Sequence, residues 1–424
     1  MTVAPPSQSE AFDHGLSTRG LWILMGTIAG MTAFAPFATD VYLPAFPNLT
    51  DDLHTTDSAA QLTLTATFLG IMIGQLIFGP LSDSLGRRRL VIVMTLATIL
   101  STVACALAPT ISFLTFARLA LGVTGGAGIV IGRAIAADIS KGPEAARFFS
   151  LLMSITMLAP LIGPIVGGAL LSWTHTWRAA FVFLTVFVIL LALAIIFFVP
   201  ETLPPDRRHP GGFSEIRKGA SSMFRDRVFM GYAITQVFAF ATLFAFLASS
   251  SFIFQETFGL TPTQYSFAFS GIVLSILFVG MLNRRLLLNF AVRSLLVWAL
   301  VIAAAAAVAL IVIMSMGSPS MWLMILGLLF VMGTRAPIGA NAMALALERS
   351  PYVGTASAII GAMTFAGALV ATPLLAILPF NTGLTMAVVM AICSILALLC
   401  TVLMARTGRN PVTNASPAGE FQPN

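Results

Sequence analysis

Three ionisable side chains fall well inside the long apolar runs of this chain: Asp40, Arg118 and Arg335. A charged group in a membrane interior is costly, and it faces a cavity or a partner rather than lipid. A carboxyl there binds and releases a proton under two opposing influences, the loss of water and the field of a nearby arginine. Asp40 is therefore a candidate proton-binding group. The alternative is a hydrated residue near the outer end of its segment.

The two buried arginines also need partners. Arg118 lies about seven residues from the outer end of its segment, roughly 10 Å deep at 1.5 Å per residue. We expect it to face inward, unless its long side chain snorkels to the surface. Arg335 lies near the middle of its segment, so we expect it to face a central cavity, with Asp40 or a bound molecule as partner. The alternative for Arg335 is hydrogen bonding to carbonyls that Pro337 leaves free.

A second group of polar residues sits in and near a short link between two apolar runs. Its members are Gly79, Asp83, Gly86, Arg87, Arg88, Arg133 and Asp138. The glycines permit a tight turn, and Asp83 can face the positive N-terminus of a neighbouring helix. Arg87 can pair with Asp138 at the end of a later segment. The simpler alternative is an anchor of positive charge, which Arg88 and Arg89 alone would provide.

Small residues recur in the run Ala159–Gly168. Gly163, Gly167 and Gly168 form a face that lets another helix approach closely. Pro160 and Pro164 remove backbone donors and permit a bend. The alternative is ordinary helix packing without a transport role.

The elements that must position these residues are membrane helices. The chain has 424 residues, of which 58% are hydrophobic and 9% are charged, and its mean hydropathy is +0.96. Soluble domains carry about 25% charged residues, and an apolar run of about 20 residues spans a bilayer as a helix. The sequence predicts an all-α membrane protein with twelve such segments: 21–46, 58–82, 90–108, 111–137, 149–171, 178–199, 229–254, 264–283, 292–315, 320–346, 353–377 and 382–405.

The positions of the basic residues predict the orientation. With the N-terminus inside, all but three of the 22 lysines and arginines fall on the cytoplasmic side, as the positive-inside rule requires. The predicted layout is a tail (1–20), a six-helix bundle (21–199), a cytoplasmic loop (200–228), a second six-helix bundle (229–405) and a tail (406–424). Both tails are expected in the cytoplasm.

Other kinds of chemistry have no support in the sequence. The net charge of +6 comes from scattered loop residues, so no nucleic-acid partner is expected. The three cysteines lie in apolar runs and the four histidines in loops or tails, which gives no metal-ligand spacing. No phosphate-binding Gly-x-x-x-x-Gly-Lys-Ser/Thr run is present. We expect no cofactor, no metal and no enzymatic activity.

Several motifs occur in one order along the N-terminal half: Thr39-Asp40-Val41-Tyr42-Leu43-Pro44-Ala45, Gly74-Gln75, the loop from Gly79 to Arg88, Arg133-Ala134-Ile135, Gly163-Pro164-Ile165-Val166-Gly167-Gly168, Trp177-Arg178 and Pro200-Glu201-Thr202. Together they resemble the bicyclomycin/chloramphenicol resistance (Bcr/CflA) family of drug:proton antiporters in the major facilitator superfamily. The resemblance spans the N-terminal half and weakens beyond residue 230. The chain departs from that family at Ala137, where members often carry an arginine.

The resemblance implies a fold and a function. It implies proton-coupled efflux of small amphipathic drugs by alternating access, in a bacterial inner membrane and as a monomer. Asp40 and Arg118 would couple the proton. Gly163, Pro164, Gly167 and Gly168 of the segment 149–171 would form an antiporter motif, and Arg87 with Asp138 would favour the outward-open state. The residues expected to contact substrate are Asp40, Tyr42, Arg118, Gln236, Arg335 and Asn341. An exporter or symporter of an endogenous metabolite with the same fold is the alternative.

Overall fold

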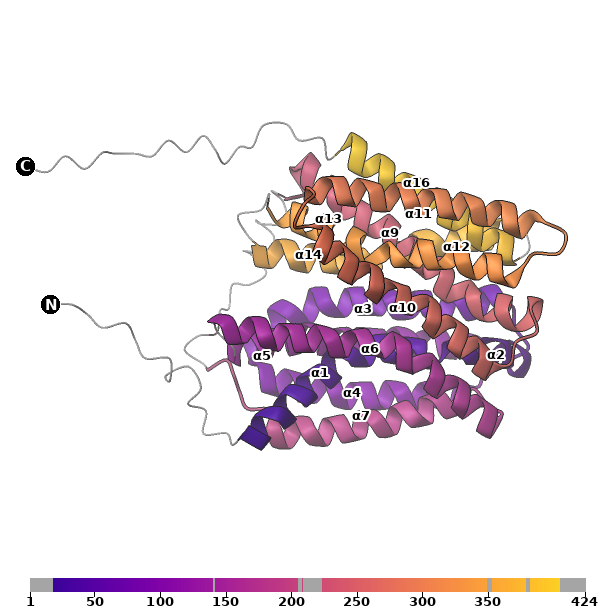
Figure 1. Cartoon of the computed structure of the whole chain (residues 1–424). Helices are drawn as coiled ribbons and strands as arrows, with labels where there is room; N and C mark the ends of the chain where they lie inside the picture. Colours follow the sequence, from indigo (N-terminus) through magenta and orange to yellow (C-terminus); the bar gives the residue numbers. More distant parts are fainter. Residues whose placement is uncertain are drawn as a thin grey trace, which may run out of the picture.

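The computed structural model describes residues 18–139, 142–204, 208, 223–348, 353–378 and 382–404. Residues 1–17, the predicted C-terminal tail and most of the predicted central loop lie outside these ranges. Within them the regular structure is helical, and the helices form two groups that pack side by side (Figure 1). We refer to these groups as the N-half and the C-half.

The N-half contains α1 (Thr18–Asp40), the short 3₁₀ helix η1 (Leu43–Ala45), α2 (Phe46–Asp52), α3 (Asp57–Leu85), α4 (Arg87–Ala106), α5 (Ile111–Ile139), α6 (Gly142–Thr174) and α7 (Arg178–Phe198). The C-half contains α9 (Arg227–Phe252), the π-helix η3 (Ile253–Thr257), α10 (Pro262–Leu286), α11 (Val292–Ser315), α12 (Met321–Gly333), α13 (Arg335–Leu347), α14 (Val353–Phe365), α15 (Gly367–Ile377) and α16 (Thr382–Leu403).

Ten stretches of the described chain are helical, long and apolar enough to cross a membrane. Together with α1 and α6, they correspond to the twelve predicted segments. Local signals fix several of their starts. The Thr56 hydroxyl accepts a hydrogen bond from the Ala59 N–H at the start of α3, and Thr261 and Gln264 form a reciprocal capping box at the start of α10. The protein is an all-α membrane protein, as predicted.

The helix ends define two faces. The terminal face carries the start of α1 and the end of α16 (Figure 1). The distal face carries α2 and the links between α4 and α5, α6 and α7, and α9 and α10. Most of the described arginines lie at the terminal face: Arg87, Arg88, Arg89, Arg133, Arg208, Arg225, Arg227, Arg284, Arg285 and Arg293. This distribution follows the predicted charge bias.

Three predicted segments are interrupted, the eleventh at Ala366 between α14 and α15, and prolines explain the other two breaks. The first segment was expected to continue as one helix to residue 46, but α1 ends at Asp40. Pro44 has no N–H to offer the Asp40 carbonyl, so the α-helical hydrogen-bond pattern stops there. In the tenth segment, Pro337 likewise leaves the Gly333 carbonyl without its donor, and the helix is interrupted at Thr334 between α12 and α13.

The halves meet along a seam that is closed at the distal face. Across it, the Gln255 amide donates to the Pro44 carbonyl at 3.0 Å, and the Phe46 and Phe252 rings lie 5.6 Å apart. Hydroxyl contacts between α6 and α10 and between α3 and α15 continue the closure: Ser172–Thr263, Ser266–Pro164, Ser270–Leu161 and Thr65–Thr372. Deeper along the seam, Phe68 of α3 packs on Phe240, Phe244 and Phe365 of the C-half.

Candidate functional site

Asp40 is the last residue of α1, and its side chain is 5% exposed. The chain then turns into η1 and α2, which carry the backbone on to the distal face. The carboxyl therefore sits where regular helix gives way to an irregular turn inside the membrane-spanning part of the N-half. It lies within electrostatic range of Arg118 and, across the seam, of Tyr265.

Arg118 lies on α5 and is completely buried. This excludes the alternative in which its side chain snorkels to the surface. Its Nη1 donates to the Ala38 carbonyl at 3.3 Å, and its guanidinium lies 4.6 Å from the centre of the Tyr42 ring. Its Nε and Nη2 have no hydrogen-bond partner, and it forms no salt bridge with Asp40. Arg118 thus sits beside the acid as a nearby positive charge that is not fully neutralised.

Tyr42 completes this cluster from the turn after α1. Its ring packs against Phe46 and Phe181, and its hydroxyl lies 3.4 Å from the Thr63 hydroxyl of α3. The ring is buried within the N-half. Tyr42 therefore supports Arg118 through a cation–π contact, and in this conformation it does not line an open cavity.

The glycine-rich face of α6 packs directly on the end of α1. A Cβ at Gly163 would lie 2.8 Å from the Asp40 Cβ, and one at Gly167 would clash with the Val41 carbonyl oxygen. On its other side, α6 contacts the C-half, because a Cβ at Gly168 would collide with Ser266 of α10. The Ser266 hydroxyl donates to the Pro164 carbonyl at 2.6 Å. The motif therefore touches both the buried acid and the opposite half.

Two of the residues expected to contact substrate from the C-half are tied to their own half. The Gln236 amide donates to the Gly339 carbonyl at 2.8 Å. Asn341 is buried and exchanges two hydrogen bonds with Asn283, of 3.1 and 3.2 Å. In this structure Asn341 joins α10 to α13, and its amide does not face a cavity between the halves.

The structure places Arg335 beside a cavity within the C-half. Arg335 was expected to line the central cavity opposite Asp40, but it faces a small cavity inside the C-half, between α9, α11 and α16. Its position on α13 directs the side chain toward these helices. The alternative, hydrogen bonding to carbonyls freed by Pro337, is also absent, because its Nε and Nη1 have no hydrogen-bond partner.

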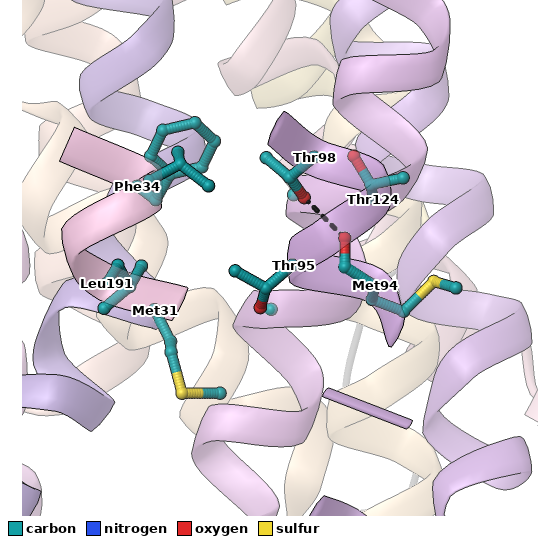
Figure 2. A pocket seen from close by; sticks show the side chains of 10 residues that line it. Met31, Phe34, Met94, Thr95, Thr98, Thr124 and Leu191 are labelled. Carbon is teal, nitrogen blue, oxygen red and sulfur yellow. Dashed lines mark hydrogen bonds between the residues drawn. The ribbon is translucent and has the colours of Figure 1, made fainter. Parts of the chain in front are cut away.

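A cavity of about 20 Å³ occupies the corresponding place in the N-half, between α1, α4, α5 and α7. Figure 2 shows Met31, Phe34, Thr95, Thr98 and Thr124 around it. The Thr98 hydroxyl donates to the Met94 carbonyl of its own helix, which is the dashed line in the view. The residues that line this N-half cavity are uncharged. The cavity therefore holds no candidate proton-binding group.

At the terminal face, the predicted contact between Arg87 and Asp138 is present, with an Nε–Oδ2 distance of 3.2 Å. Arg87 also pairs with Asp83 and donates to the Ser82 hydroxyl. Asp83 therefore binds a side chain one turn later, and the expected contact with another helix N-terminus is not seen. All these partners belong to the N-half. The Arg87–Asp138 pair is formed here while the distal seam is closed. With the distal face as the outer one, the pair thus also forms in a state that is closed to the outside.

Glu201 was not singled out from the sequence as a functional residue, although it belongs to the same network. Its carboxylate accepts hydrogen bonds from the backbone N–H groups of Arg87 and Arg88, which caps the start of α4. Arg208 lies 3.7 Å from it, and Gly86, at φ +92°, makes room for both side chains. The signal in the sequence was the Pro200-Glu201-Thr202 run. Arg133, by contrast, is exposed and has no described contact with this network.

A polar latch at the distal face joins α2 to the start of α7. The Asp52 carboxylate accepts from the Trp177 indole at 2.9 Å and from Arg178 at 2.5 Å. These hydrogen bonds, from Trp177 and then Arg178, hold the pKa of Asp52 below its usual value. Arg178 also lies over the Trp177 ring. The latch fixes α2, and with it the Pro44–Phe46 stretch that closes the seam.

Comparison with known proteins settles the family. The model of the Major Facilitator Superfamily matches residues 28–372. The chain belongs to this superfamily. It is 35% identical over 366 residues to an uncharacterized MFS-type transporter, YdgK, of Bacillus subtilis, covering 84% of this chain and 89% of that protein. It is 28% identical to a bicyclomycin resistance protein homolog of Haemophilus influenzae, covering 90% and 96%.

The fold is shared with solved transporters. A D-xylose-proton symporter superimposes with a TM-score of 0.73 at 17% identity, covering 92% of this chain and 98% of that one. The resemblance predicted from the motifs is thereby confirmed at the level of fold and family, and the chain is a secondary transporter, not an enzyme.

Proposed function

We propose that this protein exports small amphipathic drugs of the amphenicol or bicyclomycin type in exchange for protons, by alternating access of the two halves. Membership of the major facilitator superfamily and relatives named for drug resistance support a drug as cargo. Alternating access means that the halves rock around a site between them. The closed distal seam corresponds to one of the two end states.

The observation that carries the proposal is the position of α6. Its glycine face lies against Asp40 and Val41 on one side and against Ser266 on the other. The chemistry of the proton site and the movement of the C-half are thus connected through one helix, α6. A change in the charge of Asp40 alters the contact that α6 makes with α1, and α6 carries that change to the seam.

Asp40 serves as the proton-binding group and Arg118 as the charge that favours its ionised form. Because the two do not form a salt bridge, the carboxyl stays available to a proton or to a polar group of the drug. Tyr42 keeps the guanidinium in place. On the C-half, Gln236 and Asn341 would contact the drug only after their present hydrogen bonds are exchanged.

The terminal face lies on the cytoplasmic side of a bacterial inner membrane, and the protein acts as a monomer. The concentration of arginines at that face supports this orientation. The distal seam would then be the outer gate.

Everted membrane vesicles test the proposal. Addition of an amphenicol or bicyclomycin should release protons from vesicles that contain the protein and leave vesicles from a deletion strain unchanged. The deletion strain should also become more sensitive to the same drugs. If no drug moves protons, and the deletion strain instead accumulates one of its own metabolites, the alternative function of metabolite export is the correct one.

A further inference from the structure

The cavity at Arg335 has the features of a binding site for a small ligand. Its volume is about 10 Å³, and it lies inside the C-half, enclosed by α9, α11, α12, α13 and α16. Most of its wall consists of alanine, leucine, valine and isoleucine side chains. The polar groups on the wall are Arg335 and the hydroxyls of Thr242, Thr334 and Ser394.

Arg335 brings a charge that the described chain does not neutralise. Its Nε and Nη1 are buried and have no hydrogen-bond partner. The sequence between residues 227 and 403 contains two acids, Glu256 and Glu348, and both lie at helix ends rather than at this depth. Arg335 as a whole is partly exposed, but burying these two donors without a partner is unfavourable. A negatively charged ligand in the cavity would satisfy them.

The size and the chemistry of the cavity restrict that ligand. A space of this volume holds about one water-sized particle, so drug-sized molecules are excluded. One unpaired guanidinium matches one negative charge. The Ser394 hydroxyl, 3.4 Å from that of Thr242, can donate a hydrogen bond toward the cavity, whereas the Thr242 hydroxyl donates to the Phe238 carbonyl of its own helix. Phosphate or sulfate would need more room and more donors than the wall provides.

We propose that this cavity binds a single halide ion, which is chloride under ordinary conditions. Arg335 holds the ion through its free Nε–H and Nη1–H groups, and the Ser394 hydroxyl completes the site. The ion fixes the break between α12 and α13 against α9 and α16. The site is separate from the Asp40 cluster, and the proposal does not depend on what the protein transports.

The N-half provides an internal comparison. The residues that line the two cavities have the same spacing along the corresponding helices. In the N-half, α5 contributes Thr124, Gly125 and Gly128. In the C-half, the equivalent positions are Thr334, Arg335 and Ile338. Glycine thus stands in the N-half where arginine stands in the C-half. The N-half cavity should therefore bind no anion, and its residues supply matched controls.

Thermal unfolding of the purified full-length protein tests the site. A thiol-reactive dye reports unfolding through Cys105 and Cys393, which are buried. At constant ionic strength, chloride and bromide should each raise the midpoint in a saturable manner, whereas gluconate should not. Arg335→Gln should abolish this halide-dependent shift, and Ser394→Ala should move its half-saturation to higher halide concentration. Thr124→Ala, in the N-half cavity, should keep the wild-type response.

Several results would overturn the proposal. These are a wild-type midpoint that depends only on ionic strength, an Arg335→Gln protein that keeps the full halide shift, or a Thr124→Ala protein that loses it. If Arg335→Gln does not fold, binding of radioactive chloride to the wild type and to Ser394→Ala decides the matter. Equal affinity of these two proteins, or no binding to the wild type, would exclude the site. None of these measurements uses a drug, so they stand whether or not drug export is confirmed.

Discussion

Asp40 and Arg118 share one buried cluster without forming a salt bridge, which leaves the carboxyl free to change its charge. Asp40→Asn should fold and should lose proton coupling, because an amide does not titrate. Proton release from the purified protein on addition of drug is the measurement, and it should fall to the background level. Asp51→Asn, which changes an exposed acid on α2, is the matched control. Release at the wild-type level from Asp40→Asn would remove Asp40 from the mechanism.

The distal latch makes a prediction about pH. Because hydrogen bonds from Trp177 and Arg178 lower the pKa of folded Asp52, its ionised form stabilises the fold above the unfolded value of about 3.9. That stabilisation is lost as the pH falls through the lower, folded pKa. Asp52→Asn should therefore unfold at a lower temperature than the wild type at neutral pH, and the difference should shrink below about pH 4. A difference that stays constant down to the most acidic condition would show that the latch contributes no ionic stabilisation.

At the scale of single residues, the sequence was sufficient to find the buried charges but not their partners. A charge inside an apolar run stands out by composition alone, which is why Asp40, Arg118 and Arg335 were identified. The direction of a side chain depends on the rotation of its helix, and helices that are apolar on every side carry only a weak periodic signal. Arg335 was therefore assigned to the seam, although it faces the interior of the C-half.

At the scale of elements, the contact between α6 and α1 is the most sensitive to substitution. Gly167→Ala places a methyl group against the Val41 carbonyl, so α6 must move away from α1. We expect a loss of about 1–3 kcal/mol in stability, as for an overpacked core, and a large drop in transport per unit of protein in vesicles. Gly271→Ala is the control, because this helical glycine of α10 has no atom within 4 Å of its added Cβ. Equal activity of the two variants would mean that the glycine face is not a close contact.

The extent of the helices was largely predictable, and their interruptions were predictable only in part. Pro44 and Pro337 each remove a particular N–H, so the breaks after Asp40 and Gly333 could have been read from the sequence. The break at Ala366 has no such signal. It comes just before Gly367, where α15 approaches Val237 and Ala241 of α9 closely. Such a contact depends on a neighbour more than a hundred residues away along the chain.

For the molecule as a whole, alternating access requires the distal ends of α6 and α10 to move relative to each other. The Ser172 and Thr263 hydroxyls lie 3.0 Å apart across this contact. The double variant Ser172→Cys, Thr263→Cys should form a disulfide on oxidation, lose transport and regain it on reduction. Each single variant should transport normally under both conditions. Full transport by the cross-linked protein would show that this contact does not open during the cycle.

The closed seam is held without ions. None of the salt bridges among the described residues joins the two halves, and the cross-half contacts are neutral hydrogen bonds and aromatic rings. Each such contact contributes about 0.5–1.5 kcal/mol, and a tenfold change in population requires about 1.4 kcal/mol. A protonation or a bound drug that favours one conformation by about 1.4 kcal/mol therefore changes the ratio of the two conformations tenfold. Screening by salt acts on charges, and the charges that repel one another across this seam are Glu256 of the C-half and Asp51 and Asp57 of the N-half. Added salt should therefore favour the closed gate.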